Sequence, residues 1–101
     1  MASPAIEISS SRIASFCRKH GIRRLSLFGS VLRDDFRPDS DVDVLVEFKP
    51  DRVVGWEIID MEDELARILG NHRVEMINPK YLNPRLKNRI LSTAQVQYDE
   101  G

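Results

Sequence analysis

Apolar positions change their period along this chain, and each change predicts a helix or a strand. Helical spacing between N-capping serines and a glycine predicts the first helix, and short β-branched or alternating runs predict strands. The expected elements are a helix over 10–20, a strand over 23–28, a short helix over 31–35, a turn over 37–40, a strand over 41–48, a helix over 54–69, a strand over 73–78, a helix over 84–92 and a strand over 95–98. This order predicts an α+β fold with one mixed β-sheet and helices packed on one of its faces.

Two short motifs lie at the ends of neighbouring predicted strands. Gly29 and Ser30 directly follow the strand over 23–28, and ten residues later Asp41 and Asp43 open the next strand. Because side chains alternate along a strand, the two carboxylates project from the same face, about 7 Å apart at their backbones. Carboxylates in this arrangement suit a hard cation. The motifs together indicate binding of phosphate and metal.

The Gly-Ser pair, the ten-residue spacing and the Asp-x-Asp pair resemble the signature of the minimal nucleotidyltransferases of the DNA polymerase beta superfamily. The resemblance covers about residues 13–98 and includes Arg33, Glu75 and the Asn-Pro start of the last helix. It implies the polymerase-beta-like nucleotidyltransferase fold, with residues 1–101 forming a single minimal nucleotidyltransferase domain.

The resemblance also implies a catalytic set of three carboxylates. Asp41 and Asp43 would share two Mg²⁺ ions, and Glu75 would complete the ligand set and help take a proton from the attacking hydroxyl. The family more often has Asp where this chain has Glu75, which leaves a weakened site as one interpretation. Structural roles are the other: Asp41 and Asp43 could bond to loop amides, and Glu75 could pair with Arg73.

Gly29, Ser30 and Arg33 are the expected nucleotide-binding residues. The absence of a Cβ atom at Gly29 lets the backbone approach the triphosphate of ATP, whose oxygens the Ser30 hydroxyl and the following N–H groups can bind. Arg33 could contact a phosphate, or it could pair with Asp41 or Asp34 and brace the loop. Both roles of Arg33 stay open.

The family resemblance implies an antitoxin that transfers AMP from ATP to a hydroxyl, expected to be a tyrosine, of a partner HEPN-domain RNase toxin. The modification would neutralise the toxin, and the two proteins are expected to form a hetero-oligomer. One alternative is an inactive nucleotidyltransferase fold that neutralises the toxin by binding alone. Another is a sensor that binds ATP without releasing pyrophosphate.

Composition limits the other classes of partner. Fifteen basic and sixteen acidic residues give a net charge of −1, which argues against tight direct binding of nucleic acid. No apolar stretch approaches the length of a membrane span, and the residues after Met1 lack a secretion signal, so a cytoplasmic protein without a membrane partner is expected. Cys17, the single cysteine, lies on the apolar stripe of the first helix and is expected to be a small buried hydrophobe.

Charge is nevertheless segregated along the chain. Acidic residues crowd the segment 57–64, and basic residues crowd the segment 80–89. The acidic face is expected to be solvated, and the basic segment either is solvated too or contacts a phosphate-bearing partner. His20 and His72 are expected to be solvated residues beside helix ends.

Overall fold

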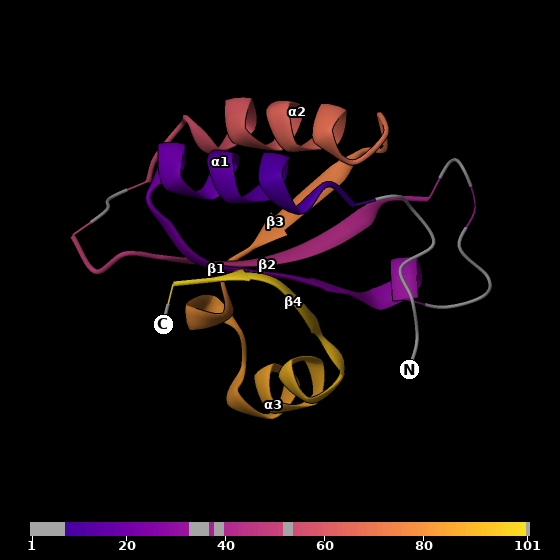
Figure 1. The fold of residues 1–101 in the computed structure, drawn as a ribbon. Coiled ribbons are helices and arrows are strands. Elements are labelled where there is room, and N and C mark those ends of the chain that lie inside the picture. Colours follow the sequence, from indigo (N-terminus) through magenta and orange to yellow (C-terminus); the bar gives the residue numbers. More distant parts are fainter. Residues whose placement is uncertain (1–7, 33–36, 38–39, 52–53, 101) are drawn as a thin grey trace.

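The computed structural model describes residues 8–32, 37, 40–51 and 54–100 of the chain. Helices, strands and two 3₁₀ turns alternate along it (Figure 1). In chain order they are α1 (Ser10–His20), β1 (Ile22–Phe28), η1 (Gly29–Leu32), β2 (Val42–Phe48), α2 (Ile58–Ile68), β3 (Val74–Ile77), η2 (Pro79–Tyr81), α3 (Pro84–Thr93) and β4 (Gln95–Asp99). None of the helices in the described ranges is long and apolar enough to cross a membrane.

The four strands form one mixed sheet in the order β3-β2-β1-β4. β1 is antiparallel to both β2 and β4, and β2 is parallel to β3. α1 and α2 lie side by side over one face of the sheet, whereas η2 and α3 lie on its other side (Figure 1). The predicted α+β fold with a mixed sheet is therefore confirmed. The expectation that the helices pack on one face holds for α1 and α2 but not for α3, which lies on the other side.

The hydrophobic core lies between the sheet and the two helices α1 and α2. Val42, Val44 and Val46, which alternate along β2, are completely buried, as are Met61 and Leu65 on α2. Burial of apolar area on this scale is the main favourable contribution to folding. By contrast, α3 has no buried residue, so the other side of the sheet is covered more thinly.

Local signals in the sequence correctly predict where α1 and α3 begin and where α1 ends. The Ser9 hydroxyl accepts a hydrogen bond from the backbone N–H of Arg12, with a distance of 3.4 Å, at the start of α1. Gly21 ends α1 with a φ of 68°, in the left-handed region that glycine adopts without strain. Asn83 Oδ1 accepts from the Arg85 N–H at 2.9 Å, directly before the first turn of α3.

The start of α2 differs from the prediction, which placed the helix over 54–69. The helix begins at Ile58, and residues 55–57 form turns instead. The Glu57 side chain accepts a hydrogen bond from the Gly55 N–H at 3.1 Å, and the Ile58 N–H bonds to the Gly55 carbonyl at 3.3 Å. A glycine with a local side-chain acceptor favours such a turn over a further helical turn.

A side chain of α2 accepts a hydrogen bond from the backbone of the edge strand β3. β3 is an edge strand, and the Met76 N–H donates to Glu62 Oε2 at 2.9 Å. Unpaired N–H groups on an edge strand are templates for pairing with another chain. Glu62 thus satisfies one N–H group of this edge and ties α2 to β3.

His20 is only partly exposed and contacts its neighbours, contrary to the expectation that it is solvated. Its ring lies 4.7 Å from the Phe16 ring, between centroids, and Nε2 lies 3.0 Å from Glu64 Oε1 of α2. Lys19 Nζ lies 3.1 Å from the same oxygen. Burial alone would raise the pKa of the Glu64 carboxyl, but the hydrogen bonds from His20 and Lys19 outweigh it and lower that pKa.

Cys17 is a buried core residue, as expected from its place on the helical stripe. Its side chain is completely buried. Burial, with a smaller contribution from Glu100, raises the pKa of the thiol to about 12. Because only the thiolate is a good nucleophile, this thiol is unreactive near neutral pH.

The lowered pKa of Glu64 predicts an acid-sensitive link between α1 and α2. A carboxyl group whose pKa is lower in the folded than in the unfolded state stabilises the fold at pH values above the unfolded pKa, which is about 4.3 for Glu. This contribution disappears as the pH falls through the pKa of the folded state. Glu64→Gln should therefore lower Tm at pH 6, and its difference from wild type should close as the pH approaches 3. Thermal melts across this range measure the effect.

Asp63→Asn is the matched control, because Asp63 is an exposed neighbour on the same helix. Its Tm should follow wild type at every pH. An equal loss in both variants would mean that the acidic helix, rather than the Glu64 link, sets the acid sensitivity.

Candidate active site

Strand pairing brings parts of both predicted motifs to one end of the sheet. In the antiparallel pair of β1 and β2, Phe28 is opposite Asp43. Gly29, the next residue after Phe28, therefore lies close to Asp43. In the parallel pair of β2 and β3, Asp43 is next to Glu75. Paired residues on adjacent strands point to the same face and lie about 5 Å apart at their backbones. Gly29, Asp43 and Glu75 therefore come from three strand ends to a single place.

Gly29 passes directly over the Asp43 carboxylate. Its φ is +78°, and a Cβ atom added there would lie 2.6 Å from Asp43 Oδ2. Such a separation is too short for any side chain, so the close approach and the backbone conformation both require glycine. The motif predicts a glycine whose backbone can approach a phosphate. Nothing in the sequence indicated that the same glycine also lets the Asp43 carboxylate approach the backbone.

One backbone hydrogen bond holds the segment with the two aspartates in relation to β3. The Val42 N–H, between Asp41 and Asp43, donates to the carbonyl of Arg73 at 2.8 Å, directly before β3 begins. Val31 in η1 is completely buried, which fixes the turn after Gly29 to the core. The site therefore stands on the sheet rather than on a free loop.

The three predicted carboxylates differ in exposure. Asp41 is exposed directly before β2, Asp43 is half-buried within β2, and Glu75 is exposed on β3. Within the described part of the chain, no hydrogen bond or ion pair engages the Glu75 carboxylate, so its expected alternative partner Arg73 does not hold it. The Glu75 carboxylate is therefore accessible to a metal ion or to a proton.

These carboxylates have the chemistry of a magnesium site, because Mg²⁺ prefers oxygen ligands. Asp43 and Glu75 are on the same face of neighbouring strands, where both carboxylates could bind one ion. Among the residues that the structure describes, no three His, Cys, Asp or Glu side chains gather closely enough to hold an ion together. The donor types fit a divalent cation, and the complete three-carboxylate ligand set stays a prediction.

The remaining predicted residues are described only in part. The backbone of Ser30 belongs to η1, the 3₁₀ turn that occupies the start of the expected short helix over 31–35. Arg33 lies outside the described residues, and so does the rest of that expected helix. The expected turn over 37–40 is supported by a hydrogen bond from the Ser40 N–H to the Arg37 carbonyl at 2.9 Å. The Ser40 hydroxyl accepts from the Arg37 N–H at 3.1 Å, so it caps this turn.

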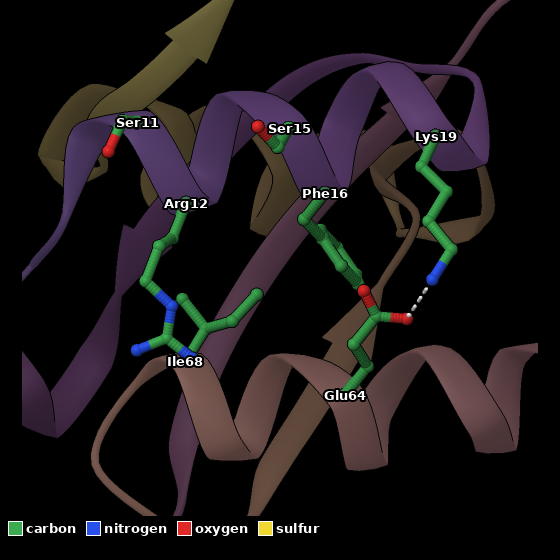
Figure 2. Close-up of a pocket in the computed structure, with 7 residues that line it drawn as sticks. All are labelled: Ser11, Arg12, Ser15, Phe16, Lys19, Glu64 and Ile68. Atoms are coloured by element: carbon green, nitrogen blue, oxygen red, sulfur yellow. Dashed lines mark hydrogen bonds and ion pairs between the residues drawn. The ribbon is translucent and has the colours of Figure 1, made fainter.

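A hollow of about 350 Å³ between α1 and α2 is separate from this site (Figure 2). Its lining includes Arg12, Phe16 and Ile68, and the ion pair of Lys19 with Glu64 spans the two helices at one end (Figure 2). Of the predicted catalytic and nucleotide-binding residues that lie in the described part of the chain, none lines it. It is a groove between packed helices, on the opposite face of the sheet from Asp43.

Comparison with known proteins points to one family. The family model described as nucleotidyltransferase domain matches residues 11–96. A relative from Methanocaldococcus jannaschii, provisionally named a protein adenylyltransferase, is 35% identical over 83 residues, which are 82% of this chain and 87% of the relative. The protein adenylyltransferase MntA of Thermococcus cleftensis is 32% identical over 73 residues, 72% of each chain.

A solved structure of a toxin-antitoxin with AMP-PNP has the same fold. Its TM-score is 0.72 with 17% sequence identity, and the match covers 91% of this chain and 74% of that one. At this identity the likeness concerns the fold alone.

Gly29→Ala should damage the site more than the fold. The left-handed backbone would cost the alanine variant about 1–2 kcal/mol of folding free energy, and the new methyl group would displace the Asp43 carboxylate. Chemical denaturation measures the first effect, and nucleotide transfer measures the second. We expect a loss of transfer much larger than the fraction of protein unfolded explains.

Gly55→Ala is the matched control for that variant. A Cβ atom at Gly55 would have its nearest neighbour, Glu57 Oε2, at 3.6 Å, an ordinary contact. Its transfer rate should stay near wild type. Full transfer by Gly29→Ala would show that the close approach to Asp43 has no catalytic consequence.

Proposed function

This chain belongs to the nucleotidyltransferase domain family, and from that premise we propose that it is an antitoxin that transfers AMP from ATP to a hydroxyl of a HEPN-type RNase toxin. Relatives named protein adenylyltransferase support a transferase of this kind. The observation that carries the proposal is the convergence of Gly29, Asp43 and Glu75 at one end of the sheet. A neighbour solved as a toxin-antitoxin with AMP-PNP supports both ATP and a toxin partner.

In the proposed reaction the acceptor oxygen attacks the α-phosphorus of ATP. A new phosphorus–oxygen bond forms, the bond to pyrophosphate breaks, and the hydroxyl proton passes to a base. Glu75 is the proposed base, because its carboxylate is exposed and lies next to Asp43. Gly29, with Ser30 and Arg33, is proposed to bind the triphosphate.

Asp41, Asp43 and Glu75 are also the residues proposed to hold Mg²⁺. Bound Mg²⁺ would neutralise charge on the triphosphate during transfer. Asp41 and Asp43 remain close to the start of β3 through the Val42 to Arg73 hydrogen bond. The chain itself therefore contributes positioning and negative charge, which are the main demands of this class of reaction.

The acceptor is proposed to be a tyrosine of the toxin. The described sheet end has Asp41 and Glu75 exposed, so a partner's side chain could approach from solvent. A hetero-oligomer with the toxin would then supply the acceptor surface. The protein is proposed to work in the cytoplasm, where ATP and an RNase target coexist.

Neutralisation by binding alone is the second candidate function. The observation that favours it is Glu75, where the family more often has Asp. A longer side chain at this position could weaken metal binding or proton transfer. The two candidates differ in whether the toxin changes mass.

Asp43→Asn should abolish transfer while the protein stays folded. Asn is nearly isosteric with Asp but removes one anionic ligand, and Asp43 is only half-buried at the sheet end. After incubation of the toxin with wild-type protein, ATP and Mg²⁺, intact-mass measurement should show added AMP units and RNase assays should show lost activity. Neither change is expected with Asp43→Asn, whose melting curve should match wild type.

Asp63→Asn is the control here too, because it removes a carboxylate from the exposed side of α2 and should keep full transfer. Normal transfer by Asp43→Asn would contradict the assigned site. If Asp41→Asn with Asp43→Asn neutralises the toxin as well as wild type and without a mass change, the binding-only function is correct.

Glu75→Gln should slow transfer by at least ~100-fold, the lower end for a positioned acid–base group. Glu75→Asp keeps the charge and should retain activity. Single-turnover rates with saturating ATP and Mg²⁺ make this comparison, and melting curves should be unchanged because Glu75 is exposed. A full rate for Glu75→Gln would place the base and third ligand elsewhere.

A further inference from the structure

A cavity of about 720 Å³ lies at the end of the sheet opposite the candidate active site. Its lining includes Phe48 at the end of β2 and Asn78 directly after β3. Asp43 and Phe48 are five positions apart in β2, which corresponds to roughly 17 Å along a strand. The cavity is thus distinct from the place where Gly29 and Asp43 meet.

Among the residues that the structure describes, four cationic side chains line this cavity, and each comes from a different part of the fold. Arg23 belongs to β1, Lys49 follows β2, Lys80 belongs to η2, and Lys87 belongs to α3. Glu47 is the single carboxylate among the described residues of the lining. A concave site with this charge favours an anionic ligand.

Existing ion pairs compensate one side of the cavity but not the other. Glu47 pairs with Arg23 at 3.1 Å through one oxygen, and Lys49 Nζ lies 3.4 Å from Glu100 Oε1. Within the described residues, Lys80 and Lys87 take part in no ion pair. The uncompensated positive charge is therefore concentrated where η2 meets α3.

Apart from Asn78, the rest of the described lining carries no polar side chain other than the Tyr81 hydroxyl, and it includes an exposed aromatic ring. Tyr81 is 80% exposed although it lines the cavity, and Phe48, Met76 and Pro79 add apolar surface. An exposed aromatic ring beside lysines is a typical platform for a nucleobase with its phosphate. The volume is within the range of small-molecule sites, roughly 300–1,000 Å³.

We propose that this cavity is a second binding site, for a nucleoside phosphate. Its base would lie against Tyr81 and the apolar wall, and its phosphate would meet Lys80 and Lys87. The ligand could be a free nucleotide or one nucleotide of an RNA strand, since both present the same chemistry. The site is independent of the proposed transfer reaction, because none of the transfer residues that the structure describes lines it.

Titration of ¹⁵N-labelled protein tests this site directly. With EDTA present and without Mg²⁺, AMP, sodium pyrophosphate and a short oligoadenylate would each be added while amide signals are followed by NMR. We expect AMP to shift the amides of Lys49, Gly55 and Tyr81 in a saturable manner, and more tightly than pyrophosphate does. Tighter binding of the oligoadenylate than of AMP at these amides would identify RNA as the source, and the reverse a free nucleotide.

Paired charge variants separate the cavity from the general basic surface. Lys80→Gln with Lys87→Gln should weaken AMP binding at least ~10-fold, because charge-assisted bonds to phosphate are lost. Arg85→Gln with Arg89→Gln removes the same charge from exposed positions of α3 outside the cavity, and should leave free-AMP binding unchanged. Melting curves for both double variants establish that they fold.

Tyr81→Ser is a second test that does not depend on the lysines. Its ring is mostly exposed, so its removal should not unfold the protein, and it should weaken AMP binding without affecting pyrophosphate. The proposal fails if AMP shifts no amides, or shifts only those near Gly29 and Asp43. Equal weakening by the two double variants, or pyrophosphate binding as tight as AMP binding, would also overturn it.

Discussion

The antiparallel pairing of β1 with β2 is the constraint on which the rest of the site depends. It sets Phe28 opposite Asp43, so the chain must turn over the carboxylate as it leaves β1. Only a residue without Cβ fits there, since an added atom would lie 2.6 Å from Asp43 Oδ2. The glycine of the Gly-Ser motif and the second aspartate of the Asp-x-Asp motif are thus in contact with each other. The spacing between the two motifs in the sequence is the length of the segment that connects the paired strands β1 and β2.

The parallel partner strand adds the third carboxylate. α2 crosses over the sheet between β2 and β3, and its Glu62 side chain bonds to the Met76 N–H. Together with the hydrogen bond from Val42 to Arg73, this contact keeps β3 in the register that places Glu75 beside Asp43. A change that shifted this register by one residue would turn Glu75 to the opposite face.

The same strands have different chemistry at their two ends. The end with Asp41, Asp43 and Glu75 gathers negative charge, whereas the other end gathers the cations of the proposed nucleoside phosphate site. α1 and α2 bury one face of the sheet, and α3 buries none of its own residues. Residues for binding are therefore on strand ends and on the thinly covered side, while stability comes mainly from the helix-covered face.

The sequence alone determined the features that depend on near neighbours: the capped starts of α1 and α3, the alternation of β2, and the two motifs with their family. The late start of α2 was not predicted, because the Gly55 N–H bonds to the Glu57 side chain in a local turn that replaces a further helical turn. Only the tertiary structure decided that His20 meets Glu64 and that Gly29 lies against the Asp43 side chain. Such contacts join residues far apart in the chain, and strand register and helix packing set them, neither of which a local pattern encodes.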